Sequence, residues 1–593
     1  MVQEEPTPPL DPAAELAQRT VRATQRLASF QSANAPLFTV ILQQAADALA
    51  ELGETAAREP YRLADATGQY WSDLWKVHER AVAQAQGQAV PPVIEPASSD
   101  RRFRSPQWSS DAAYDSLKQT YLLTARWMRD AIAALDAGTD ATRIASFWAQ
   151  QWLEAVAPTN FPWLNPDVIE RAVESRGESL RRGFELLLSD IERGDGRVAV
   201  QQTDYEAFEV GRNLATTPGA VVFRNELVEL LQYAPTTEQA YRRPLFVVPP
   251  WINKFYILDL RPENSFVRWA VAEGYTVFVV SWRNPGRDQS QTTFADYLRL
   301  GILEPLDAVE RATGERDVTA MGFCIGGTLL ATARAYLAAH GDQRIQAAAY
   351  LATLLDFTDV GDVSVFINER SVEALDEVMA SSGYLPAWMM QDTFNALRPN
   401  DLVWRYWVNG YLMGEEPAPF DILFWNVDST RMPHAMQSEY LRAMYLENRL
   451  IVPGGIALDG TAIDLRQIAT PSYFLASHED HIAPWRSVYR GMQGHGGARR
   501  FVLSGSGHVA GPINPPAANK YDYRTSDSAD DSADAEHWYA SAELTPGSWW
   551  PDWSAWNREF SGDLVPAREP GTGGLPVIAP APGTYVHERA VAV

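Results

Sequence analysis

Apolar residues in the first two hundred positions recur at three- and four-residue steps, the spacing of one face of a helix. The spacing is followed by Leu37, Ile41, Ala45, Ala48 and Leu52, and again by Leu117, Tyr121, Ala125, Met128 and Ile132. Asn165 before Pro166 is a typical helix start, with Asn as the cap and Pro at the first position. The pattern predicts a helical N-terminal domain over residues 1–204, with a disordered Pro-rich start at 1–12.

The pattern changes after residue 204, where short apolar runs alternate with helical segments. Strands are predicted at 220–223, 245–248, 275–280, 317–321, 347–354, 471–476 and 500–503, with helices at 265–273, 296–313, 328–337 and 485–493. This alternation favours a mostly parallel sheet covered by helices on both faces, an α/β fold spanning 205–593. It lapses at about 360–445, a stretch rich in Trp, Met and Phe, which we interpret as a cap inserted over the sheet. An acidic low-complexity stretch at 526–536 is interpreted as a solvated insertion.

The single cysteine of the chain, Cys324, lies in the sequence Gly322-Phe323-Cys324-Ile325-Gly326-Gly327, between a predicted strand and a predicted helix. This is the pattern of the nucleophile elbow of the α/β-hydrolase fold, with sulfur in place of oxygen. Small residues stand two positions before and two positions after the nucleophile because the strand and helix backbones cross closely there. The helix dipole also favours a thiolate at this position. A lone cysteine is more commonly a buried, inert thiol, but the elbow pattern favours the catalytic interpretation.

Two later strands are each followed by a candidate partner for the thiol. Asp480 follows the strand at 471–476 and His508 follows the strand at 500–503, which gives the chain order nucleophile, acid, histidine. The imidazole would take the thiol proton, and the carboxylate would fix the imidazole tautomer. Glu479 is an alternative acid, and we prefer Asp480 because the shorter carboxylate is usual at this strand end. His478 and His481 are alternative bases, and we assign His481 to a supporting position around the site.

A tetrahedral intermediate also requires hydrogen-bond donors for its oxyanion. The backbone N–H of Ile325, directly after the nucleophile, is the first expected donor. The second should come from the loop after the strand at 245–248, where Pro249 and Pro250 have no N–H. Trp251 and Ile252 are the nearest candidates, and we prefer Ile252.

Composition limits the possible functions. The chain has 50 Lys and Arg residues against 75 Asp and Glu residues, a net charge of −25. This charge argues against binding nucleic acid through long-range electrostatic attraction to its phosphates. One cysteine allows no intramolecular disulfide, and the N-terminus lacks the pattern of a signal peptide, so we expect a cytoplasmic protein. No apolar stretch is long enough to predict a transmembrane helix. With no clustered Cys/His ligands and no Gly-rich phosphate loop, we predict no metal or other cofactor.

Longer motifs give the chain a resemblance to a known family. They are Val248 to Leu260 (VPPWINKFYILDL), Val280 to Pro285 (VSWRNP), the elbow, Arg398 to Trp404, Pro419 to Asn426, Glu479 to Ile482, Gly507-His508, Ile513 to Pro516 and Gly547 to Pro551. The likeness extends into the helical region through Thr159-Asn160-Phe161 and Gly177 to Leu180. The chain resembles the class I polyhydroxyalkanoate synthases, the polyester polymerases of storage granules. Trp251 stands at a position where we would expect a small residue in much of this family. It lies in the loop that should supply the second oxyanion donor.

The resemblance implies that (R)-3-hydroxyacyl-CoA, with short monomers such as 3-hydroxybutyryl, is the substrate and that CoA is released. It implies an acyl-enzyme at Cys324, with Asp480 helping to activate the 3-hydroxyl that attacks the next thioester. It also implies a homodimer, contact with the growing polyester and the granule surface, and CoA contacts for which Arg283 and Arg398 are candidates. Two alternatives stay open: a cytosolic thioesterase or esterase with the same triad, and a non-catalytic protein that coats granules.

Overall fold

The computed structural model describes residues 11–526 and 534–590, and the chain divides into two compact units. The helical unit comprises the chain up to Asp204 together with Phe394–Ala418. The sheet unit comprises Tyr205–Thr393 and the chain from Pro419 onward. Most of the predicted disordered start at 1–12 and most of the acidic stretch at 526–536 lie outside the described residues.

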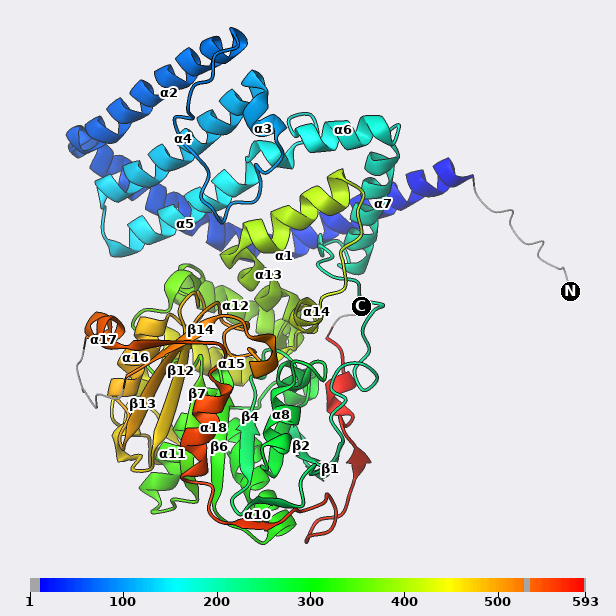
Figure 1. Ribbon diagram of the computed structural model, residues 1–593, viewed down its shortest axis with the longest axis vertical. Coiled ribbons are helices and arrows are strands. Elements are labelled where there is room, and N and C mark those ends of the chain that lie inside the picture. The colour runs from blue at the N-terminus through cyan, green and yellow to red at the C-terminus, as the bar shows by residue number, and fades with distance from the viewer. Residues whose placement is uncertain (1–10, 527–533, 591–593) are drawn as a thin grey trace, which may run out of the picture. The chain divides into compact units, whose positions relative to one another are not determined.

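The helical unit is built on long helices that pack side by side (Figure 1). Its helices are α1 (Pro12–Arg58), α2 (Ala64–Ala85), α3 (Gln107–Ser110), α4 (Ala112–Leu135), α5 (Thr139–Ala155), α6 (Pro166–Glu174) and α7 (Glu178–Arg193). Helix α1 packs on α5, and α4 packs on both α2 and α5. Leu52, Ile132 and Ala145 form part of the buried core between them. The Asn165 side chain caps α6 by accepting the Asp167 N–H at 3.1 Å, as its sequence predicts.

Residues 394–418, which the sequence pattern assigns to the cap, pack within the helical unit instead. They form two short π-helical segments, Asn400–Trp404 and Trp407–Leu412. The Tyr411 hydroxyl donates to the Asp190 carboxylate at 2.5 Å, and the Gln202 amide donates to the Leu402 carbonyl at 2.7 Å. These contacts join residues about two hundred positions apart, which no local pattern could reveal.

The sheet unit contains an 11-stranded sheet in the order β15-β14-β13-β12-β7-β6-β4-β5-β2-β1-β17, counted over the described residues. The strands are β1 (Gly219–Arg224), β2 (Val228–Tyr233), β4 (Leu245–Val248), β5 (Val277–Trp282), β6 (Val318–Phe323), β7 (Ile345–Leu351), β12 (Ser472–Ser477), β13 (Arg499–Ser504), β14 (Asp522–Thr525), β15 (Glu543–Pro546) and β17 (Ala579–Pro580). Strands β5, β4, β6, β7, β12 and β13 are parallel, and the outer strands on both sides are antiparallel. The antiparallel strand β2 was not predicted.

Helices cover the strands of this sheet (Figure 1). They include α8 (Phe266–Ala272), α9 (Phe294–Leu298), α10 (Glu304–Thr313), α11 (Ile325–Ala339), α16 (Trp485–Gln493), α17 (Ala535–Ser541) and α18 (Trp550–Arg558). Helix α8 packs on β5, α11 on β6, and α16 on β12. Strands alternating with helices in this way match the predicted α/β class. Within the described residues, no helix has the combined length and apolarity needed to cross a bilayer.

The part of the cap that belongs to the sheet unit is mainly helical. It contains α12 (Glu369–Ser382), the first turns of α13 (Ala387–Leu397), α14 (Asp421–Val427) and α15 (His434–Tyr440). The two-residue strands β8 (Tyr384–Leu385) and β9 (Met432–Pro433) pair antiparallel between these helices. The cap segments before and after residues 394–418 therefore both belong to the sheet unit.

Candidate active site

The nucleophile elbow is visible in the backbone at Cys324. Cys324 occupies the N-cap position of α11, directly after β6, with φ 53° and ψ −127°, a strained conformation for a side-chain-bearing residue. A Cβ added at Gly322 would lie 2.5 Å from the Gly327 Cα, and one at Gly326 would lie 2.4 Å from the Val248 carbonyl oxygen. Both positions therefore exclude any larger residue. The elbow holds the half-buried thiol at the end of β6, as the sequence pattern predicts.

The structure brings Asp480 and His508 together beyond the ends of β12 and β13. Because these strands run parallel in register, with Ser477 opposite Ser504, their following loops lie at the same edge of the sheet. The His508 Nδ1–H donates to Asp480 Oδ2 at 2.7 Å. The other carboxylate oxygen accepts the backbone N–H groups of Ile482 (2.8 Å) and Ala483 (2.9 Å). This carboxylate therefore fixes both the orientation and the tautomer of the imidazole.

The His508 ring also lies close enough to the thiol for Cys324 to influence it electrostatically. Since Nδ1 is occupied by Asp480, the nitrogen that faces Cys324 is Nε2. Burial disfavours the imidazolium, but the charges of Asp480 and Cys324 outweigh it and raise the pKa of His508 well above its usual value. Phe323 supports the ring by stacking on it, with centroids 5.7 Å apart. The arrangement therefore favours transfer of the thiol proton to His508.

The alternative acid and bases lie in different surroundings. Glu479 and His478 are exposed, and the His478 ring stacks on Tyr539 with centroids 5.6 Å apart. His481 is partly buried in the loop directly after Asp480, where its carbonyl lies against Gly361. The geometry thus joins Asp480, rather than Glu479, to the His508 ring. Across the described residues, no group of three or more His, Cys, Asp or Glu side chains is placed to hold a metal ion.

The two expected oxyanion donors lie on adjoining backbone segments. Ile325 is the first residue of α11, so its N–H has no acceptor within the helix. The loop after β4 passes close to this helix, since the Pro249 carbonyl oxygen lies 2.5 Å from the Cβ position of Gly326. Ile252 follows on that loop, and its carbonyl accepts the Thr430 N–H at 3.0 Å. Trp251 is 2% exposed, and its ring lies 4.8 Å from Tyr297 and 5.5 Å from Trp282.

Two tyrosines near the thiol were not identified from the sequence. Tyr440 ends α15, and Tyr445 lies in the π-helical segment Leu441–Leu446 that follows it. Burial raises the pKa of both phenols, and the charge of the nearby Cys324 raises each further. Their rings lie 6.1 Å apart, and Phe357 packs on Tyr445 at 5.0 Å. The aromatic richness of the cap was the only sequence signal for them.

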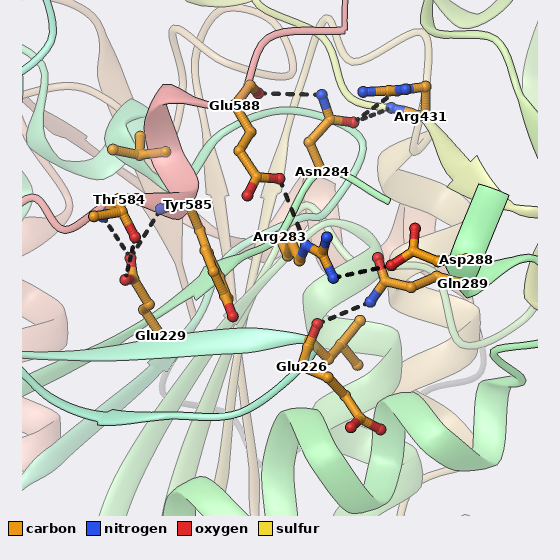
Figure 2. A network of polar contacts seen from close by, with 12 residues as sticks. Glu226, Glu229, Arg283, Asn284, Asp288, Gln289, Arg431, Thr584, Tyr585 and Glu588 are labelled. Atoms are coloured by element: carbon orange, nitrogen blue, oxygen red, sulfur yellow. Dashed lines mark hydrogen bonds and ion pairs between the residues drawn. The ribbon is translucent and has the colours of Figure 1, made fainter. Parts of the chain in front are cut away.

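The candidate CoA contacts Arg283 and Arg398 differ in their surroundings. Arg283 lies in an ion-pair network, 3.3 Å from Asp288 and 3.6 Å from Glu588 (Figure 2). Arg398 lies 4.0 Å from Asp401, and its side chain is 38% exposed. Neither the ion pairs of Arg283 nor the surroundings of Arg398 identify a phosphate-binding site.

Replacing Asp480 by asparagine should lower the pKa of His508. The variant removes the charge and the ionic hydrogen bond that oppose the burial cost, so the pKa should fall to or below about 6.5. In the wild type, the linked stabilisation is fully present below about pH 6.5 and is lost as the pH rises through the raised folded-state pKa. An NMR titration of ¹⁵N-labelled imidazoles measures the change. Glu479→Gln is the control; an equal shift in that variant would point to Glu479 as the partner.

The sheet, the elbow and the chain order nucleophile, acid, histidine define an α/β-hydrolase-fold protein. Residues 233–515 match the family model for the alpha/beta hydrolase fold, and residues 99–270 match the model described as the poly-beta-hydroxybutyrate polymerase (PhaC) N-terminus. The fold class predicted from the sequence, an α/β-hydrolase fold with a helical N-terminal region, is therefore confirmed.

Relatives that match most of the chain place it in a particular family. The poly(3-hydroxyalkanoate) polymerase of Methylorubrum extorquens is 46% identical over 547 residues, covering 91% of this chain and 89% of the relative. Subunit PhaC of the corresponding polymerase of Rhizobium meliloti is 42% identical, with 91% and 88% covered. The chain belongs to the poly(3-hydroxyalkanoate) polymerase family, as its motifs predict. Among solved structures, a monoacylglycerol lipase from Paleococcus ferrophilus matches at 14% identity and a TM-score of 0.30, covering 47% of this chain and 90% of the lipase.

Proposed function

We propose that this chain is a polyester synthase, an acyltransferase that joins (R)-3-hydroxyacyl groups from CoA thioesters into polyhydroxyalkanoate and releases CoA. The observation that carries the proposal is Cys324 at a nucleophile elbow, close to a His508 that Asp480 orients. Membership in a family of polymerases supplies the reaction class. On the resemblance of its motifs, we propose short monomers such as 3-hydroxybutyryl-CoA as substrates.

In the proposed reaction, His508 Nε2 takes the proton of the Cys324 thiol, and the thiolate attacks the thioester carbonyl. The Ile325 and Ile252 N–H groups stabilise the oxyanion of the tetrahedral intermediate. The intermediate collapses by breaking the bond to the CoA sulfur, which leaves with the proton from His508. Cys324 then carries the acyl group. Asp480, together with His508, then takes the proton of the 3-hydroxyl of the bound acyl group, whose oxygen attacks the carbonyl of the next CoA thioester. An ester bond forms, the bond to the CoA sulfur breaks, and CoA leaves with that proton. The scheme uses no metal and no further cofactor.

The cap suits this reaction because hydrolysis of the acyl-enzyme would end each chain. Tyr440 and Tyr445 lie near the thiol, and Phe294, Phe357 and Trp251 pack around Tyr440. These apolar rings would exclude water from the thioester. We therefore assign the cap to protecting the growing chain from hydrolysis.

The proposal includes a homodimer in the cytoplasm, attached to the storage granule that the product forms. Exposed aromatic residues of the helical unit support contact with an apolar polyester: Trp71, Trp75 and Trp163 are 64%, 63% and 69% exposed. Light scattering of the purified protein tests the dimer. Fluorescence of a tagged protein in cells that store polyester tests the attachment.

Purified protein supplied with (R)-3-hydroxybutyryl-CoA should release CoA and form insoluble polyester in matching amounts. Free CoA is measured with a thiol reagent, and soluble 3-hydroxybutyrate and polymer are separated by sedimentation and chromatography. Release of CoA with soluble acid alone would identify a thioesterase. Release of no CoA would favour the non-catalytic coating protein. Comparison with a longer 3-hydroxyacyl-CoA tests the proposed monomer range.

A further inference from the structure

Lys254 is a buried lysine in the loop that carries the proposed second oxyanion donor. It is 2% exposed, and its ammonium donates to the main-chain carbonyls of Val586 (2.9 Å) and Glu588. Burial lowers the pKa of Lys254, although the charges of Asp428 and Glu588 oppose the change. Burying an ammonium is costly unless its hydrogen bonds are satisfied. The two carbonyls meet that requirement, and both belong to the last part of the chain.

The segment that provides these carbonyls, residues 584–588, is itself fixed to the sheet (Figure 2). Glu229 of β2 is fully buried, and its carboxylate accepts the Thr584 N–H (2.8 Å), the Thr584 hydroxyl (2.8 Å) and the Tyr585 N–H (3.0 Å). Asn284, after β5, donates to the Glu588 carbonyl at 3.1 Å. The acceptors of Lys254 therefore occupy defined positions relative to the central strands.

The main chain of the same loop is held on its other side by residues 425–430. The Lys254 carbonyl accepts the Trp425 indole N–H at 2.7 Å, and the Ile252 carbonyl accepts the Thr430 N–H at 3.0 Å. Asn284 Oδ1 accepts the N–H of Arg431 at 3.0 Å, so the 584–588 segment and this part of the cap share one partner (Figure 2). Cap residues therefore donate hydrogen bonds to the carbonyls of this loop, and the Lys254 ammonium donates hydrogen bonds to the carbonyls of residues 586 and 588. Together these contacts fix the loop.

We propose that Lys254 is a positioning residue: its bonds to the 586 and 588 carbonyls form a latch that sets the Ile252 N–H. The inference rests on the proposed function, which assigns an oxyanion to that N–H. A donor helps only if it lies within about 0.5 Å of its required position, and loops hold such positions less well than helices or strands. A side-chain anchor two residues from the donor supplies the missing rigidity.

Lys254→Met tests the latch, because it keeps the length of the side chain and removes its donors. The kcat for CoA release from (R)-3-hydroxybutyryl-CoA should fall about 100-fold with little change in KM. Alkylation of Cys324 by iodoacetamide should keep its wild-type rate, which a general loss of structure would not allow. Lys520→Met, the same change at an exposed lysine of the sheet unit, is the control and should stay within twofold of the wild type. A kcat for Lys254→Met within threefold of the wild type overturns the proposal.

A second variant keeps the test decisive if Lys254→Met folds poorly. A chain ending at Tyr585 loses both carbonyls but keeps the Glu229 contacts, whereas a chain ending at Arg589 keeps the whole latch. The first should lose kcat as Lys254→Met does, and combining the two changes should cost no more than either alone. Additive losses overturn the latch.

Hydrogen exchange separates this inference from the proposed function. The amides of residues 252–254 should exchange faster in Lys254→Met and in the chain ending at Tyr585 than in either control. If the wild type releases no CoA, the proposed function fails, yet faster exchange would still establish the latch. Unchanged exchange at residues 252–254 in both variants overturns it whatever the activity.

Discussion

Replacing Cys324 by alanine should lower CoA release by about 10⁴-fold or more, because the proposed reaction has no other acceptor for the acyl chain. The variant keeps the strained backbone, helix α11 and the Asp480–His508 pair, so its thermal unfolding midpoint should stay close to that of the wild type. The released CoA and the polymer formed from (R)-3-hydroxybutyryl-CoA are measured together. A Cys324→Ala protein that keeps more than a few per cent of the wild-type rate would refute the nucleophile assignment.

The same experiment can identify the acyl-enzyme directly. Butyryl-CoA has no 3-hydroxyl, so it can acylate the thiol but cannot extend the chain. Brief incubation followed by acid quenching and mass spectrometry should find one butyryl group on the peptide that contains Cys324. His508→Ala is the companion variant, and it should slow this labelling because the thiol then loses the acceptor of its proton. Labelling of a different residue would show that another side chain is the nucleophile.

The parts of this site that local patterns could predict are those fixed by one turn of the chain. Cys324 is set by the small residues around a single strand-to-helix crossing, and the clash at Gly322 involves Gly327 of that same turn. Asp480 and His508 follow apolar strands, and parallel strands in register bring their ends to one edge. Chain order and strand ends therefore sufficed to predict that both residues lie at this edge. The hydrogen bond between Asp480 and His508 follows from the parallel pairing of β12 and β13.

The parts that could not be predicted depend on partners far away in the sequence. Strand β2 contains Glu229 and Gln232, which interrupt its apolar run, although all six of its residues are buried. The Glu229 charge is tolerated inside because Arg224 and the backbone of residues 584 and 585 bind it. A local pattern shows the polar residue but not its partners. Lys254 is a second example, since its acceptors lie more than three hundred residues away.

Substituting alanine for Gly326 should destabilise the sheet unit by about 3 kcal/mol or more. The added Cβ would meet the carbonyl oxygens of Val248 and Pro249 at 2.4 and 2.5 Å, and backbone atoms at that distance cannot move aside as a side chain could. Any relief must displace α11 or the loop after β4, so the variant should lose activity even where it folds. Gly53→Ala is the matched control, because a Cβ there meets nothing within 4 Å and the residue lies inside α1.

The control should raise the stability of the helical unit by about 0.4–1 kcal/mol, as alanine restricts the unfolded chain. Calorimetry compares the unfolding midpoints of both variants with the wild type, and iodoacetamide labelling reports whether Cys324 is still presented. A Gly326→Ala protein with wild-type stability and labelling would mean that the strand–helix crossing is looser than these distances require. In that case the Ile325 N–H, carried by the same turn, would not be held at a fixed distance from the thiol either.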